Sequence, residues 1–103
     1  MKLAGSILVV TTALLFPRFA AAEGAEYGRR LAENWCASCH VVSAGQRSTD
    51  AHAPSFGTIA QSPDFNADRL AYLLLDPHPK MAKLALSRRA INDIAAYILS
   101  IKK

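Results

Sequence analysis

The sequence has only two cysteines among its 103 residues, and just two residues separate them. A disulfide between such near neighbours closes a very small loop, and the stabilisation gained by restricting the unfolded chain falls with loop size. The scarcity and the spacing therefore exclude a disulfide framework of the kind that supports many small secreted domains. We interpret the two thiols as reactive rather than structural.

Strand periodicity, internal repeats and low-complexity tracts are also missing, which leaves an all-α domain as the predicted fold class. A large excess of one sign of charge is missing too. The chain has 12 basic and 8 acidic residues, a net charge of +4. This excess is too small to indicate binding to nucleic acid.

The N-terminal residues 1–22 have the pattern of a secretory signal peptide. Lys2 precedes an apolar stretch, Leu3–Phe16, and three alanines ending at Ala22 form the small-residue cleavage site. An uncleaved membrane anchor is the alternative, but the stretch is shorter than the roughly 20 apolar residues that a bilayer requires, and Pro17 ends it. We expect cleavage after Ala22, a periplasmic location and no stable membrane insertion afterwards.

Removal of this segment leaves a single predicted domain, residues 23–103. It loses two basic residues, so ten remain against eight acidic ones and the net charge is about +2. A chain of this length is near the size where an apolar core alone is marginal, so a cross-link or cofactor is expected to help stabilise it.

Periodicity and punctuation divide this domain into helices and loops. We predict a first helix over Glu26–Asn34 with apolar residues at Tyr27, Leu31 and Trp35, followed by a loop over Val41–Pro63 that contains a short turn at Phe56–Ala60. A second helix is predicted from the N-cap Asn66 to Asp76 and Pro77, followed by a loop over His78–Leu86. Ser87 is predicted to cap a final helix, whose apolar stripe consists of Ile91, Ile94, Ile98 and Ile101. The first loop is long enough to need something to wrap around.

The motif Cys36-Ala37-Ser38-Cys39-His40 is the pattern for covalent haem attachment. Its two thiols add to the two haem vinyl groups, and the adjacent imidazole reaches the iron. A zinc site is a weaker interpretation, because the other two histidines do not form the close second pair that zinc fingers use. A thioredoxin-like dithiol is weaker still, because it needs a strand-helix-strand context.

A second axial ligand is predicted at Met81, the one methionine left once Met1 is removed with the leader. It lies in a proline-containing loop that could cover the distal face of the haem, and its thioether is a soft, neutral donor that favours reduced iron. An ordinary buried methionine is the alternative. His78 and His52 compete as ligands, but His78 lies between two prolines and His52 is most simply an exposed loop residue.

With these motifs in order, the chain resembles class I cytochromes c over essentially the whole mature domain. The resemblance implies N- and C-terminal helices packed across each other, with loops and further helices around one covalently bound haem c. It places Tyr27, Gly28 and Tyr97 at the helix crossing and implies that the Pro54 carbonyl accepts a hydrogen bond from His40. Ala82 stands where many members have a proline.

These features predict an electron carrier rather than an enzyme, a monomer that exchanges single electrons with redox partner proteins. A tightly bound haem subunit of a dehydrogenase or oxidase complex is the main alternative, and an enzyme or gas sensor with an open distal site is a third. Predicted walls of the haem crevice are Trp35, Phe56, Ile59, Leu70, Leu74 and Leu84. Basic residues predicted around its exposed edge are Arg47, Lys80, Lys83 and Arg88.

Overall fold

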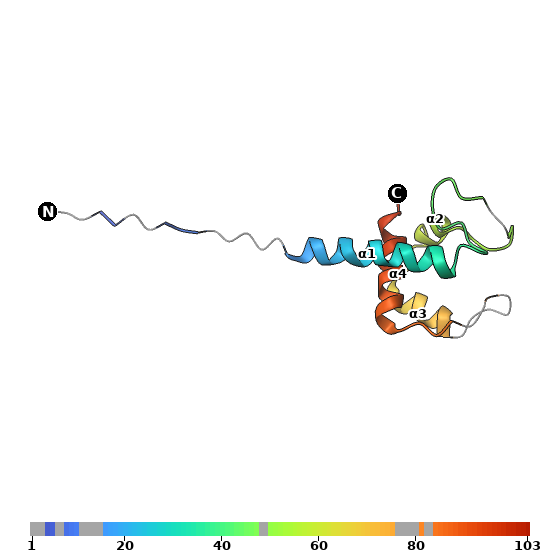
Figure 1. Ribbon diagram of the computed structural model, residues 1–103. Helices are drawn as coiled ribbons and strands as arrows, with labels where there is room; N and C mark the ends of the chain where they lie inside the picture. Colours follow the sequence, from blue (N-terminus) through green and yellow to red (C-terminus); the bar gives the residue numbers. More distant parts are fainter. Residues whose placement is uncertain (1–3, 6–7, 11–15, 48–49, 76–80, 82–83) are drawn as a thin grey trace.

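The computed structural model describes residues 4–5, 8–10, 16–47, 50–75, 81 and 84–103. Within these residues the chain is all-helical, without strands (Figure 1). In chain order the helices are α1 (Phe16–Trp35), α2 (Phe56–Ala60), α3 (Ala67–Leu75) and α4 (Arg88–Ser100). The predicted fold class is confirmed. None of the described helices has both the length and the apolar character needed to cross a membrane.

Each predicted helix is present, and α1 is longer than predicted because it begins at Phe16 instead of Glu26. It therefore continues through the proposed cleavage point after Ala22, which stays a prediction. The predicted turn is the short helix α2. The proposed stop of the next helix, at Asp76 and Pro77, lies outside the described residues.

Side-chain caps explain where the last three helices begin. The hydroxyl of Ser55 accepts a hydrogen bond from the Thr58 amide at 3.1 Å, and the hydroxyl of Ser87 accepts one from the Ala90 amide at 3.1 Å. The Asn66 side-chain oxygen accepts from the amide three residues later at 2.8 Å. Each cap provides a partner for an amide that the first helical turn leaves without one.

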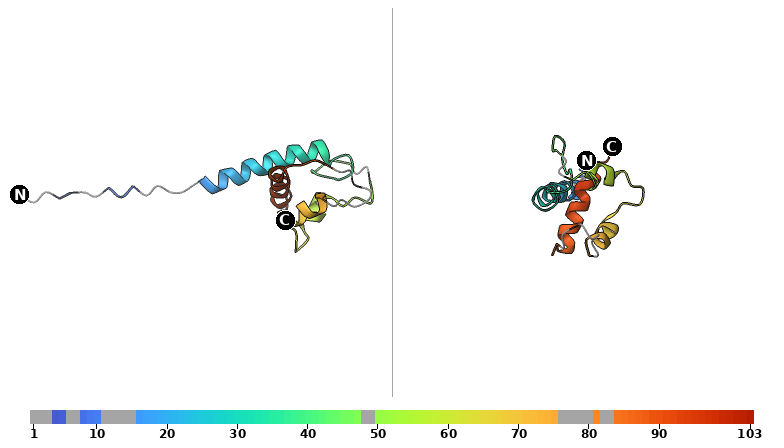
Figure 2. Two further views of the ribbon diagram at one scale, coloured as in Figure 1. Left: turned by 90° about the horizontal axis from the view of Figure 1, so that it is seen from below. Right: turned by 90° about the vertical axis from the view of Figure 1, so that its right-hand side faces the viewer.

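Helix α4 is the centre of the fold, since α1, α2 and α3 all pack against it. It crosses α1 instead of running alongside it, as the views in Figures 1 and 2 show. Gly28 lies at the crossing, where a Cβ atom would be only 1.9 Å from the Asp93 carbonyl oxygen and 2.9 Å from the Ile94 amide nitrogen. The crossing therefore depends on the absence of a side chain at this position.

Only part of the predicted apolar stripe of α1 is buried, since Leu31 packs against the hydrophobic core while Trp35 is 56% exposed. Gly28 and Ala32 are buried, whereas Tyr27 is 50% exposed and carries the Arg30 guanidinium over its ring. The place of Gly28 at the crossing agrees with the resemblance to cytochromes c. A close helix crossing selects small residues, so the apolar spacing of Tyr27 and Trp35 does not mark the buried stripe.

We expect Gly28→Ala to lower the free energy of unfolding by about 2–3 kcal/mol or more, because the added methyl group forces two backbones apart in a close-packed crossing. Chemical denaturation of the purified holoprotein measures this loss. Gly57→Ala on α2 is the matched control, since its added Cβ would come no closer than 3.8 Å to another group. Equal stability of the two variants would contradict the proposed tight crossing.

The hydrophobic core consists of two clusters. The larger one joins α1, α2 and α4 and contains Phe56, Ile94, Tyr97 and Ile98. The smaller one joins α3 to the start of α4 and contains Ala71, Leu74 and Ile91, with Met81 packed against it. Three residues of the predicted α4 stripe are buried, and Ile101 at the end of the helix is half-buried.

Candidate functional site

A cavity of about 370 Å³ is lined by residues of both hydrophobic clusters. Its lining includes every residue of the predicted crevice wall: Trp35, Phe56, Ile59, Leu70, Leu74 and Leu84. The attachment motif contributes Cys36, Cys39 and His40, and the later loop contributes Met81. The structure thus brings together predicted site residues that are far apart in the sequence.

The attachment motif continues directly from the end of α1. The amide of Cys36 donates to the Ala32 carbonyl at 2.8 Å, and the amide of His40 donates to the Cys36 carbonyl at 2.9 Å. This last bond joins residues four apart, as in a helical turn, and such spacing places two side chains on the same side of the chain. Cys36 and His40 both line the cavity, where Cys36 is half-buried and Cys39 is exposed.

The imidazole of His40 is fixed by two contacts. Its Nδ1 lies 2.6 Å from the Pro54 carbonyl oxygen, and its ring packs at a tilt against Phe56 with the ring centroids 5.7 Å apart. A carbonyl only accepts hydrogen bonds, so Nδ1 carries a proton, and in the neutral ring Nε2 has the lone pair. The second ring nitrogen is thereby prepared to bind a metal.

Met81 is half-buried and packs against the smaller hydrophobic cluster. Because it also lines the cavity, its thioether and the His40 imidazole share one space. Of the competing histidines, His52 is exposed and lines the same cavity. His78 lies outside the described residues, together with Ala82.

These residues fit a haem. The wall is predominantly apolar, as the faces of a macrocycle require, while two thiols, an imidazole and a thioether are the groups that would attach a c-type haem and bind its iron. Burial raises the pKa of the Cys36 thiol to about 11. A redox dithiol requires the opposite, a lowered thiol pKa.

The predicted ring of basic residues is only partly described. Arg88 forms an ion pair with Asp68, which reduces the charge that it presents to a partner. Arg47 is exposed. Lys80 and Lys83 lie outside the described residues, so the basic edge stays a prediction.

Gln46 was not predicted as a site residue, yet its side-chain amide contacts three backbone groups around the attachment motif. Its Nε2 donates to the carbonyls of His40 at 2.6 Å and Ala37 at 3.0 Å, and its Oε1 accepts from the Val42 amide at 2.9 Å. A glutamine in an irregular loop gives no periodic or motif signal. The glycine before it, Gly45, is the one local cue for a turn.

Comparison with known proteins agrees with this geometry. The family model for cytochrome c matches residues 25–102. The chain is also similar to a protein named cytochrome c-552 from Bradyrhizobium diazoefficiens, with 48% identity over 102 residues that cover 99% of this chain and 97% of that protein. No solved structure gives a significant match.

Proposed function

The chain belongs to the cytochrome c family and carries one covalently bound haem c, and from this premise we propose that it is an exported carrier of single electrons with His40 and Met81 as the axial iron ligands. The observation that carries the proposal is the state of His40: its Nδ1 is held by the Pro54 carbonyl, so its Nε2 is free to bind iron in a cavity that Met81 also lines.

The haem supplies a metal that gains and loses one electron. The residues of the chain attach it, orient its ligands and control its surroundings. In our proposal Cys36 and Cys39 form the thioether bonds, and Pro54 holds the His40 ring in one orientation during both oxidation states. Met81 provides a neutral sulfur donor, which favours the reduced iron. With His40 and Met81 both bound, the iron would have no open position for oxygen or peroxide.

The walls of the cavity serve the same function. Burial of apolar side chains such as Phe56, Leu70 and Leu74 excludes water and lowers the local dielectric, which disfavours the more positive oxidised centre. Trp35 and Cys39 line the cavity yet remain exposed, so one side of the site reaches the protein surface. We propose that electrons enter and leave at this side.

Export is the second part of the proposal. Residues 1–22 are proposed to direct secretion and to be removed, which leaves residues 23–103 as a periplasmic domain. Covalent haem attachment makes this domain self-sufficient after export, because its cofactor cannot dissociate. Redox proteins are the proposed partners.

A stable subunit of a larger redox complex is the second candidate. Tyr72 and Leu75 on α3 are 67% and 75% exposed, and exposed apolar side chains close together can mark a protein interface. The free-carrier proposal predicts a monomer in isolation, whereas a permanent subunit is expected to associate or to be recovered with its partner.

The test uses protein purified from the periplasm of a host that attaches haem to exported chains. We expect the mass of residues 23–103 plus one haem, a weak red absorption band of sulfur bound to ferric iron, and a monomer on size exclusion. A mass equal to that of the unmodified chain would end the proposal. Rapid binding of cyanide or carbon monoxide to the native protein would instead indicate an open distal site.

A further inference from the structure

Gln46 connects the attachment motif to the loop that follows it. Its amide nitrogen donates to the carbonyls of Ala37 and His40, and its amide oxygen accepts from the Val42 amide. The nitrogen has two hydrogens and both are used. One neutral side chain thus binds backbone groups before, at and after the proposed iron ligand.

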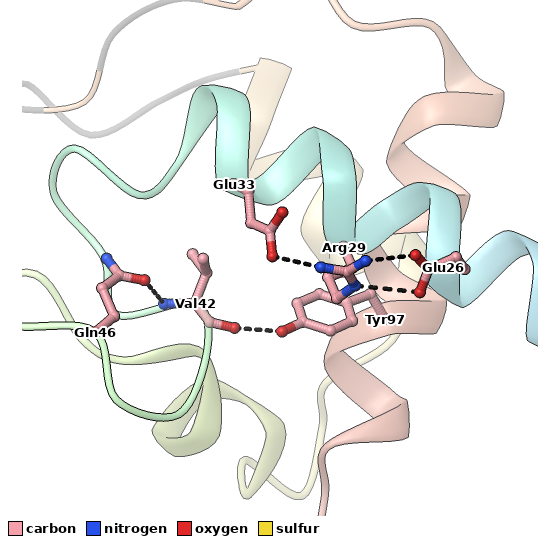
Figure 3. A network of polar contacts seen from close by, with 6 residues as sticks. All are labelled: Glu26, Arg29, Glu33, Val42, Gln46 and Tyr97. Atoms are coloured by element: carbon pink, nitrogen blue, oxygen red, sulfur yellow. Dashed lines mark hydrogen bonds and ion pairs between the residues drawn. The ribbon is translucent and has the colours of Figure 1, made fainter.

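The local backbone places Gln46 for these contacts. Gly45 has a φ of +82°, in the left-handed region that glycine adopts without strain. The backbone amide of Gln46 donates to the Ser43 carbonyl at 3.4 Å. The chain therefore turns here, and the side chain of Gln46 points toward the motif. Figure 3 shows the contact between Gln46 and the Val42 amide.

Val42 ties this group of contacts to the core. Its side chain is 1% exposed, and its carbonyl accepts a hydrogen bond from the Tyr97 hydroxyl on α4 (Figure 3). Opposite sides of one residue are therefore held by Gln46 and by Tyr97. Tyr97 holds the loop without contact to His40, whereas Gln46 contacts His40 directly, which makes the two residues a natural pair for comparison.

We propose that Gln46 is a positioning residue for the haem centre: its amide fixes the backbone of His40, while Pro54 fixes the ring of the same residue. This inference rests on the proposed function of His40 as an iron ligand. Two independent restraints, one on the backbone and one on the ring, determine how the imidazole points into the cavity. The amide hydrogens also offset the negative ends of two carbonyl groups beside the ligand.

The first experiment compares Gln46→Met with Tyr97→Phe in the haem-loaded protein. Methionine keeps the length of glutamine but cannot donate to either carbonyl. We expect Gln46→Met to shift the paramagnetic proton NMR signals of the His40 ring and to move the reduction equilibrium about threefold toward the oxidised state, because the two carbonyls lose their donors. Tyr97→Phe is expected to lower the unfolding temperature, while the NMR signals of His40 and the reduction equilibrium keep their wild-type values.

The second experiment uses Gln46→Glu, which keeps the shape of the side chain and the acceptor for Val42 and so guards against a folding failure of the first variant. Arg89→Gln makes the same change of net charge at an exposed position. We expect the ring signals of His40 to move in Gln46→Glu and to stay unchanged in Arg89→Gln.

Unchanged His40 signals in both Gln46 variants would overturn the proposal, and so would an equal shift in Tyr97→Phe, because either result would leave Gln46 with a purely structural role. Failure of the proposed function is distinguishable, since it would show in the wild-type protein as the absence of attached haem or of iron-bound histidine signals.

Discussion

Replacing both Cys36 and Cys39 with serine is expected to yield an exported chain that has no bound haem and shows no cooperative unfolding transition. Without thiols the chain cannot form either thioether bond. Among the described residues the two hydrophobic clusters are small, with seven and three buried residues, and both contribute to the wall of the cavity that the haem would fill. The whole unfolding free energy, on the order of 5 kcal/mol for a small domain, is therefore expected to be lost.

Mass spectrometry and thermal melting followed by far-ultraviolet circular dichroism measure the two effects. Ser38→Ala is the control, because Ser38 is an exposed residue of the same motif and offers no thiol for attachment. It is expected to keep the haem and a cooperative melt. A double serine variant that melts cooperatively near the wild-type temperature would show that the polypeptide alone builds its core, contrary to the role proposed for the cofactor.

The proposed attachment motif could be identified in the sequence because covalent chemistry is local. Five consecutive residues define the positions of two thiols and an imidazole, and no knowledge of distant contacts is needed to interpret them. Helix starts were predictable for the same reason, since Asn66 and Ser87 cap amides only three residues away. The contact between His40 and Pro54 is longer in range, and only the resemblance to cytochromes c predicted it.

The buried face of α1 was only partly predictable from apolar periodicity, which identified Leu31 but also selected the exposed Tyr27 and Trp35. That pattern selects large side chains, but the crossing with α4 requires Gly28, which contributes no apolar surface at all. The length of α1 was also underestimated, because residues 1–22 were assigned to a signal peptide, whereas the alanines before Gly24 favour a helix and Pro17 lies in its first turn, where proline is tolerated. Here the summed preference of several residues outweighs the cost of one glycine.

Gln46 was missed for a different physical reason. Side-chain-to-backbone hydrogen bonds depend on the path of the whole loop, which bends through Gly45 at positive φ. Nothing in the composition of the loop distinguishes this glutamine from one exposed to solvent. Only the three distances to neighbouring backbone groups show its place in the site.

Replacing Met81 with alanine is expected to abolish the sulfur-to-iron absorption band, to lower the reduction potential and to open the distal side to cyanide and carbon monoxide, while the haem stays attached. The thioether stabilises reduced iron, so its loss favours the oxidised state. The half-buried side chain also packs against the smaller cluster, and its truncation is expected to cost about 2 kcal/mol of stability, the lower end for such a change.

The control for Met81→Ala is His52→Ala, because the imidazole of His52 is the described alternative ligand in the same cavity. This variant is expected to keep the red band, the potential and the slow reaction with cyanide, since an exposed loop histidine can be removed without opening the distal face. Loss of the band in His52→Ala would contradict our assignment, because the nitrogen of His52 cannot itself produce a sulfur band. Retention of the band in Met81→Ala would show that Met81 is not the ligand. The pair of variants thus separates a thioether bond to iron from a methionine that only fills the core.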